Sequence, residues 1–232
     1  MKAYERDCKD ANDKTIKAAM SNAYKTKVAE FGTPISAKEY EEFRTYAAAR
    51  KIRISGFRNY VGDIETIKTI IDDINEVGLD FPRILDERSG VVLELDFDMK
   101  DEDFATTDSG HVIHLNASYF CDVKKLEKVY NEAVKEGDFV SGTDWRAIGR
   151  HEAGHVVQNF YQFDVLKIAL MCLPSRQEAE LFNKLETDLS VYSTAYEDGR
   201  EIISESFSGF YGRVGNIFAD HFVKECLKCK DL

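Results

Sequence analysis

The sequence predicts an α+β fold in which a small mixed sheet precedes a mostly helical C-terminal part. Two segments with Val, Ile and Leu at alternating positions, "SGVVLELDFD" (89–98) and "GHVIHLN" (110–116), are typical of strands that bury one face. Segments with helical spacing of apolar residues surround them, and from residue 144 onward almost every segment is of this kind. With 232 residues, 44% of them hydrophobic, the chain can bury one sizeable core.

Residues 1–50 are expected to form a helical N-terminal arm. Residues 3–31 are predicted to be one long polar helix with few apolar positions. A second helix is predicted to begin after Ser36, because Ser36 and Glu39 have the spacing of a capping box. Residues 51–232 are then expected to form the main domain.

The main domain is predicted to begin with a strand and a long helix. The segment "KIRISGF" (51–57) is typical of a short strand, and an amphipathic helix should follow, with Asp63 as its N-cap and Gly78 at its end. The predicted strand at 110–116 is expected to be the edge strand over a cleft, where a peptide could add in extended form. A helix over residues 122–137 is predicted after it.

Charge and cysteine content exclude several classes of protein. A formal net charge of −11 argues against a nucleic-acid-binding surface. No apolar run approaches the roughly 18 residues that span a bilayer, and the N-terminus lacks the apolar core of a secretory signal. Five widely spread cysteines are typical of a reducing compartment. We therefore expect a cytoplasmic protein without nucleic-acid or membrane partners.

The segment "DWRAIGRHEAGHVVQNFYQF" (144–163) carries the strongest chemical signal. On a helix, His151 and His155 lie about 40° apart around the axis, so both rings can reach one metal ion. Glu152 lies beside that face, where it can touch a metal-bound water. Chance produces such a motif in about one chain in a hundred of this composition. Gly154 costs roughly 1 kcal/mol against alanine inside a helix, so we expect it to be needed for close packing.

Two histidines leave zinc one protein ligand short. The best source of a third is the predicted helix after Asp198, in which Glu201 and Glu205 lie four residues apart among apolar residues. One of these glutamates is expected to bind the metal, and the other to accept the remaining N–H of a ligand histidine.

These motifs resemble those of gluzincin metallopeptidases. The gluzincin pattern is a His-Glu-x-x-His helix followed by a Glu-x-x-(Ser/Ala)-(Asp/Glu) helix, which "HEAGH" and "EIISE" match. The likeness extends to lethal-factor-like peptidase domains, whose second helix reads Glu-x-x-Ala-Glu-x-Phe after a tyrosine in a Ser-x-Tyr-Ala context. Here "SVYS" places Tyr192 at that tyrosine. The resemblance covers residues 143–212 and implies that residues 51–232 are a zincin-like catalytic domain.

The resemblance also implies a role for each polar residue. The zinc ligands would be His151, His155 and Glu201, with one Zn²⁺ per chain. Glu152 would be the general base, taking a proton from the metal-bound water and passing it to the leaving amine. Glu205 would orient a ligand histidine through a hydrogen bond.

A donor for the developing oxyanion is part of the same pattern, and Tyr192 is the candidate. The sequence departs from the family here: the tyrosine lies about two residues further from the second helix, and Ser193 and Ser204 replace alanines. Tyr196 and His221 are the alternatives for this role.

Two further segments, at 53–74 and 101–120, resemble proteins that bacteriophages and prophages carry near their head-morphogenesis genes. This resemblance implies a virion-associated location and phage structural proteins as partners. The expected function is a zinc-dependent endopeptidase acting on a peptide or protein. The alternatives are a phage virion or assembly module on a peptidase fold, and a toxin-like protease effector.

Overall fold

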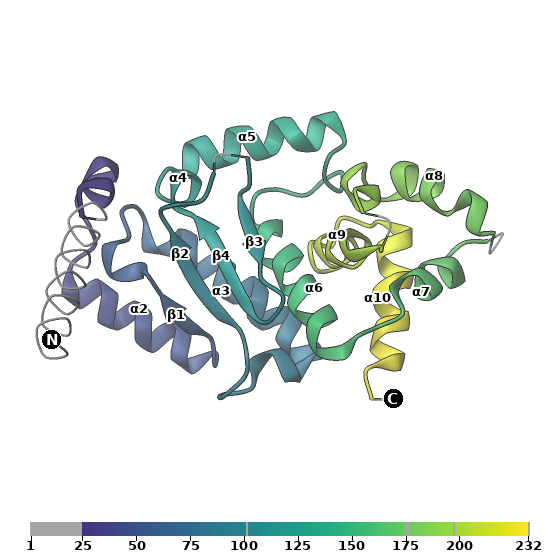
Figure 1. The fold of residues 1–232 in the computed structure, drawn as a ribbon, viewed down its shortest axis with the longest axis horizontal. Helices are drawn as coiled ribbons and strands as arrows, with labels where there is room; N and C mark the ends of the chain where they lie inside the picture. Colours follow the sequence, from purple (N-terminus) through teal and green to yellow (C-terminus); the bar gives the residue numbers. More distant parts are fainter. Residues whose placement is uncertain (1–24, 101, 175–176, 197, 232) are drawn as a thin grey trace, which may run out of the picture.

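The computed structural model describes residues 25–100, 102–174, 177–196 and 198–231, and it confirms the α+β class (Figure 1). The strands are β1 (Arg53–Ser55), β2 (Val92–Asp96), β3 (Ala105–Thr107) and β4 (Val112–Asn116). The helices of the N-terminal half are α2 (Ala37–Ala49), α3 (Ile64–Asp80), α4 (Ala117–Phe120) and α5 (Val123–Glu136). Those of the C-terminal half are α6 (Ala147–Tyr161), α7 (Val165–Cys172), α8 (Glu178–Asp188), α9 (Arg200–Tyr211) and α10 (Ile217–Cys229).

The four strands form one mixed sheet in the order β1-β2-β4-β3. β1, β2 and β4 run parallel, and β3 pairs antiparallel with β4. Alternation along β2 and β4 gives the sheet one apolar and one polar face, as the sequence predicts. On the polar face, Glu94 lies opposite His114, with a carboxylate oxygen 3.2 Å from Nδ1. The apolar face is built from two buried opposite pairs, Leu93 with Ile113 and Leu95 with Leu115.

The edge strand was predicted wrongly. The segment at 110–116 supplies β4, which lies between β2 and β3, so the edge on that side of the sheet is β3. β3 has three residues, Ala-Thr-Thr, none of them buried. Three residues are too few to show an alternation of apolar and polar positions. The strand pairs with β4 through its backbone and contacts α6 through the side chain of Thr107.

The start of α3 is confirmed, but its predicted end is wrong. The side chain of Asp63 accepts a hydrogen bond from the backbone N–H of Glu65, which caps the helix. The helix continues past Gly78 to Asp80. Gly78 is needed for packing, because a Cβ there would collide with the side chain of Leu85.

Only part of the predicted helical arm, residues 1–50, lies within the described residues. Most of the predicted helix over 3–31 lies outside them, although residues 25–31 are helical. The capping box of Ser36 and Glu39 at the start of α2 is confirmed in both directions. α2 contributes Phe43 and Ala47 to the hydrophobic core that also includes the apolar face of the sheet.

α6 lies between the sheet and the C-terminal helices (Figure 1). It contacts α3, β3 and the 3-10 helix η2 (Pro82–Leu85) on one side and α9 on the other, while α9 in turn packs on α10 and α7. None of the helices within the described ranges is both long and apolar enough to cross a membrane. The predicted active-site helix, α6, is thus packed against α3 and β3 as well as against α9.

Candidate metal centre

The site forms where α6 and α9 cross. α6 carries His151 and His155, and α9 carries Glu201. A Cβ on Gly154 would lie 2.8 Å from the Cα of Ser204, closer than real Cβ atoms approach a backbone atom. The glycine that the sequence singles out therefore permits the close crossing that brings the three side chains together.

These three side chains converge on one point. Their ligand atoms all lie within 4.8 Å of one another, and they form the one such group among the described residues. Oε2 of Glu201 is 3.2 Å from Nε2 of His151 and 3.3 Å from Nε2 of His155. This oxygen is buried and has no hydrogen-bond partner within the described part of the chain. Two imidazole nitrogens and one orphaned carboxylate oxygen are a donor set that fits a divalent metal ion.

The pKa values of His151 and Glu201 also fit a site for a metal cation. Burial opposes the charged form of each group, but the neighbouring groups outweigh it. The carboxylates of Glu201 and Glu205 raise the pKa of His151 well above 6.5. The two imidazoles lower the pKa of Glu201 to about 2. The two carboxylates thus favour positive charge on His151, and the two imidazoles favour the anionic form of Glu201.

Glu205 fixes the orientation of His151. Its side chain is 1% exposed, and Oε1 lies 2.8 Å from Nδ1 of the ring. Its other oxygen accepts a hydrogen bond of 3.0 Å from the backbone N–H of Val140. With Nδ1 held by Glu205, Nε2 faces Glu201. The two glutamates that the sequence left interchangeable from spacing alone therefore occupy different sides of the same histidine.

Glu152 lies beside the three candidate ligands without joining them. Its side chain is buried, and Oε2 accepts a hydrogen bond of 2.6 Å from Oγ1 of Thr107 on β3. The sequence analysis missed Thr107, which lies 45 residues away on a three-residue strand. A buried carboxylate that faces the same hollow as His151, and whose position is fixed by a hydroxyl donor, is well placed to exchange protons with a bound water.

The three candidate donors lie in different places. Tyr192 lies in the 3-10 turn η3 (Tyr192–Thr194), with its ring centroid 5.9 Å from that of His151, and burial raises its pKa. Tyr196 is 47% exposed at the outer rim, with the Arg200 guanidinium over its ring. His221 lines a separate hollow on α10 together with Met171 and Cys172. The ring of Tyr192 thus lies beside that of a candidate ligand, while Tyr196 lines one hollow together with His151, His155 and Glu201.

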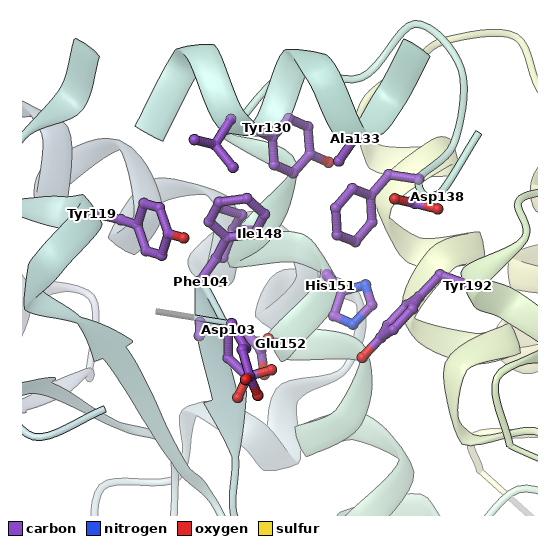
Figure 2. A pocket seen from close by; sticks show the side chains of 14 residues that line it. Asp103, Phe104, Tyr119, Tyr130, Ala133, Asp138, Ile148, His151, Glu152 and Tyr192 are labelled. Carbon is purple, nitrogen blue, oxygen red and sulfur yellow. The ribbon is translucent and has the colours of Figure 1, made fainter. Parts of the chain in front are cut away.

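Two adjoining hollows meet at the site. One is a cavity of about 340 Å³ with mostly aromatic and aliphatic walls (Figure 2). The other, of about 730 Å³, is mostly polar and runs along β3, with Thr106, Asp108 and Asn159 in its lining. His151 and Glu152 line both. The two hollows therefore meet at the candidate metal centre, and residues of β3 line both.

Comparison of the chain with protein-family models, with curated proteins and with solved structures finds no match. What the site can do therefore rests on its own geometry. A group of two histidines and one glutamate that could hold a metal ion lies beside a buried carboxylate and a polar hollow of about 730 Å³.

Proposed function

We propose that the protein is a zinc-dependent endopeptidase with a zincin-like fold. The observation that carries the proposal is the convergence of His151, His155 and Glu201 around an orphaned carboxylate oxygen, with Glu152 alongside. Two neutral imidazoles and one carboxylate suit zinc and leave a position for water. A purely structural zinc site would use a fourth protein ligand and would not need a buried carboxylate next to the metal.

Each residue has a defined task in the proposed reaction. Bound zinc would polarise the peptide carbonyl and lower the pKa of its water ligand. Glu152 takes a proton from the attacking water and then delivers it to the leaving amine. Tyr192 donates its hydroxyl hydrogen to the developing oxyanion. Glu205 keeps the metal-binding nitrogen of His151 aimed at the centre.

The sheet gives the substrate a place to bind. β3 is a short edge strand, and its outer side borders the polar hollow. A substrate in extended form can pair with this edge through its backbone, which positions a peptide bond without selecting its sequence. α6 packs beside the mixed sheet and contacts β3 through the Thr107–Glu152 hydrogen bond. This arrangement supports the zincin-like fold.

Metal content and cleavage test the proposal together. The purified protein should contain close to one zinc per chain, and His151→Ala or His155→Ala should remove it. Glu201→Ala should weaken zinc binding far more than Glu205→Ala, whose loss should be nearer the 10–100-fold of an outer hydrogen-bond partner. A proteome-derived peptide library should contain peptides that the zinc-loaded protein cuts.

Two results would end the proposal. Stoichiometric zinc in both histidine variants would place the metal elsewhere. A protein that keeps its zinc and cuts no peptide in the library would favour the assembly-module alternative.

A further inference from the structure

One wall of the cavity beside the candidate metal centre is a continuous series of aromatic rings. Ring centroids are 4.8 Å apart between Phe104 and Tyr119, 5.7 Å between Phe104 and Tyr130, and 5.0 Å between Tyr130 and Phe139, which are stacked. The Phe139 ring then lies 5.7 Å from that of Tyr192. The wall thus runs without interruption from the interior of the cavity to the proposed oxyanion donor.

Aliphatic side chains from two helices complete the wall on the side of the aromatic rings. α5 contributes Val129 and Ala133, and α6 contributes Ile148. The hydroxyl of Tyr130, which could have made the interior polar, is engaged by Oγ1 of Thr143 at 3.2 Å. In Figure 2, Tyr130 and Ala133 lie on the α5 side of the cavity, away from Glu152. A small alanine at that position leaves room for a substrate group to extend toward α5.

Carboxylates line the cavity near the site. Glu102 and Asp103 are exposed, and Asp138 is partly buried near Tyr192 (Figure 2). An anionic side chain entering the cavity would pass these groups and then lose its hydration among aromatic rings. A large uncharged side chain would instead bury apolar area in a cavity of about 340 Å³, which falls in the range of ligand pockets.

We infer that this cavity selects the substrate: it takes a large aromatic or long aliphatic side chain next to the cleaved bond and rejects Asp and Glu. The inference rests on the proposed function, because it places the scissile bond at Glu152. The cavity shares His151, Glu152 and Tyr192 with the metal centre. The side chain that occupies it must therefore belong to a residue flanking that bond, since successive Cα atoms are only 3.8 Å apart.

Matched peptides test the inference. Starting from one decapeptide that the protein cuts, the residues on either side of the bond are changed singly to Phe, Leu, Ala and Glu. At one of the two positions, kcat/KM should be roughly 10- to 100-fold higher for Phe or Leu than for Ala, and lowest for Glu. Equal rates for Phe, Ala and Glu at both positions would overturn the inference.

Ala133→Phe is the variant that fills the cavity. It should lower kcat/KM for the Phe peptide by roughly the same 10- to 100-fold and leave the Ala peptide within about threefold. Glu132→Phe adds the same bulk to the neighbouring exposed position of α5, and it should leave kcat/KM unchanged for both the Phe peptide and the Ala peptide. If Ala133→Phe does not fold, Ala133→Leu provides a smaller obstruction at the same place. An unchanged preference in a folded, zinc-bound Ala133 variant would contradict the assignment of the cavity.

Binding separates failure of this inference from failure of the proposed function. The dissociation constants of the same peptides for Glu152→Gln, measured by fluorescence anisotropy, do not require hydrolysis. A preference for Phe over Ala that Ala133→Phe removes would support the cavity even if the parent protein cut nothing. Equal binding of all the peptides would overturn the cavity assignment, whether or not the parent protein is a peptidase.

Discussion

At the scale of single residues, the hydrogen bond from Thr107 to Glu152 is the contact with the clearest consequence for catalysis. A hydroxyl 2.6 Å from Oε2 restricts the carboxylate to one orientation beside the candidate ligands. Thr107→Val removes the hydroxyl and keeps the shape. Because a hydrogen bond to a charged group contributes about 1.5–3 kcal/mol, we expect kcat to fall roughly 10- to 100-fold with zinc content unchanged.

Thr107→Ser is the matched control for this prediction. It keeps the donor and loses only a methyl group, so it should retain most of the activity. Equal kcat for the valine variant and the parent would mean that Glu152 is positioned by α6 alone.

The second prediction at this scale concerns the proton on His151. Because Glu201 and Glu205 raise the pKa of His151 well above its usual value, we expect the ring to carry a proton near neutral pH when no metal is bound. Zinc binds only the neutral ring, so binding should release close to one proton, and affinity should fall about tenfold for each pH unit below that pKa. Calorimetric titration with zinc in two buffers of different ionisation enthalpy measures the release. A binding heat that does not depend on the buffer would show that no proton is displaced.

The sequence predicted the residues of the site better than their partners. The spacing of His151 and His155 on one helix face follows from helical geometry alone, and it is reproduced in α6. Which glutamate faces the ligand nitrogens depends on how α9 crosses α6, which no local pattern contains. Thr107 was missed for the same reason, since its role arises from tertiary packing of a strand on a helix.

At the scale of elements, the α6–α9 crossing decides whether a metal centre forms. Gly154→Ala should improve helix propensity by roughly 1 kcal/mol in isolation. Here the added methyl group would lie 2.8 Å from the Ser204 Cα, so the helices must separate and Glu201 must move away from the histidines. We expect a lower melting temperature and weaker zinc binding, measured by thermal unfolding and competition with a chelator.

Ser204→Ala is the control at the same contact. Oγ of Ser204 is buried and has no hydrogen-bond partner within the described residues, so its removal should leave zinc affinity unchanged. A Gly154→Ala protein that is more stable and binds zinc as tightly as the parent would show that the crossing tolerates a side chain.

The two elements that were predicted wrongly, the end of α3 and the edge strand, have a physical explanation. Elements with strong local signals, such as the capping box of α2 and the N-cap of α3, begin where predicted. Gly78 was read as a helix end, although its bare backbone makes room for Leu85. β3 has too few residues for any periodicity, so β4 was taken for the edge. In each case tertiary packing overrides the local pattern.

At the scale of the whole molecule, a metal at the α6–α9 crossing would link α6, which packs on α3 and β3, to α9, which packs on α7 and α10. Zinc present at about a hundredfold over its dissociation constant should stabilise the folded state by about 2.7 kcal/mol. For a chain of this length that is a rise in melting temperature of roughly 5–10 °C. Removal of the metal with a chelator should reverse the rise, and readdition of zinc should restore it. The melting temperature of His151→Ala should respond neither to zinc nor to the chelator. An equal response in that variant would mean that zinc binds at another place in the protein.

The most direct measurement is peptide cleavage by Glu152→Gln alongside its zinc content. The amide keeps the size of the side chain and can still accept the Thr107 hydroxyl, but it cannot take a proton at neutral pH. We expect the variant to fold, to bind one zinc per chain, and to hydrolyse a peptide that the parent cuts at least 10²–10⁴-fold more slowly. Cleavage of that peptide at the parental rate would show that Glu152 is not the general base and would contradict the proposed mechanism.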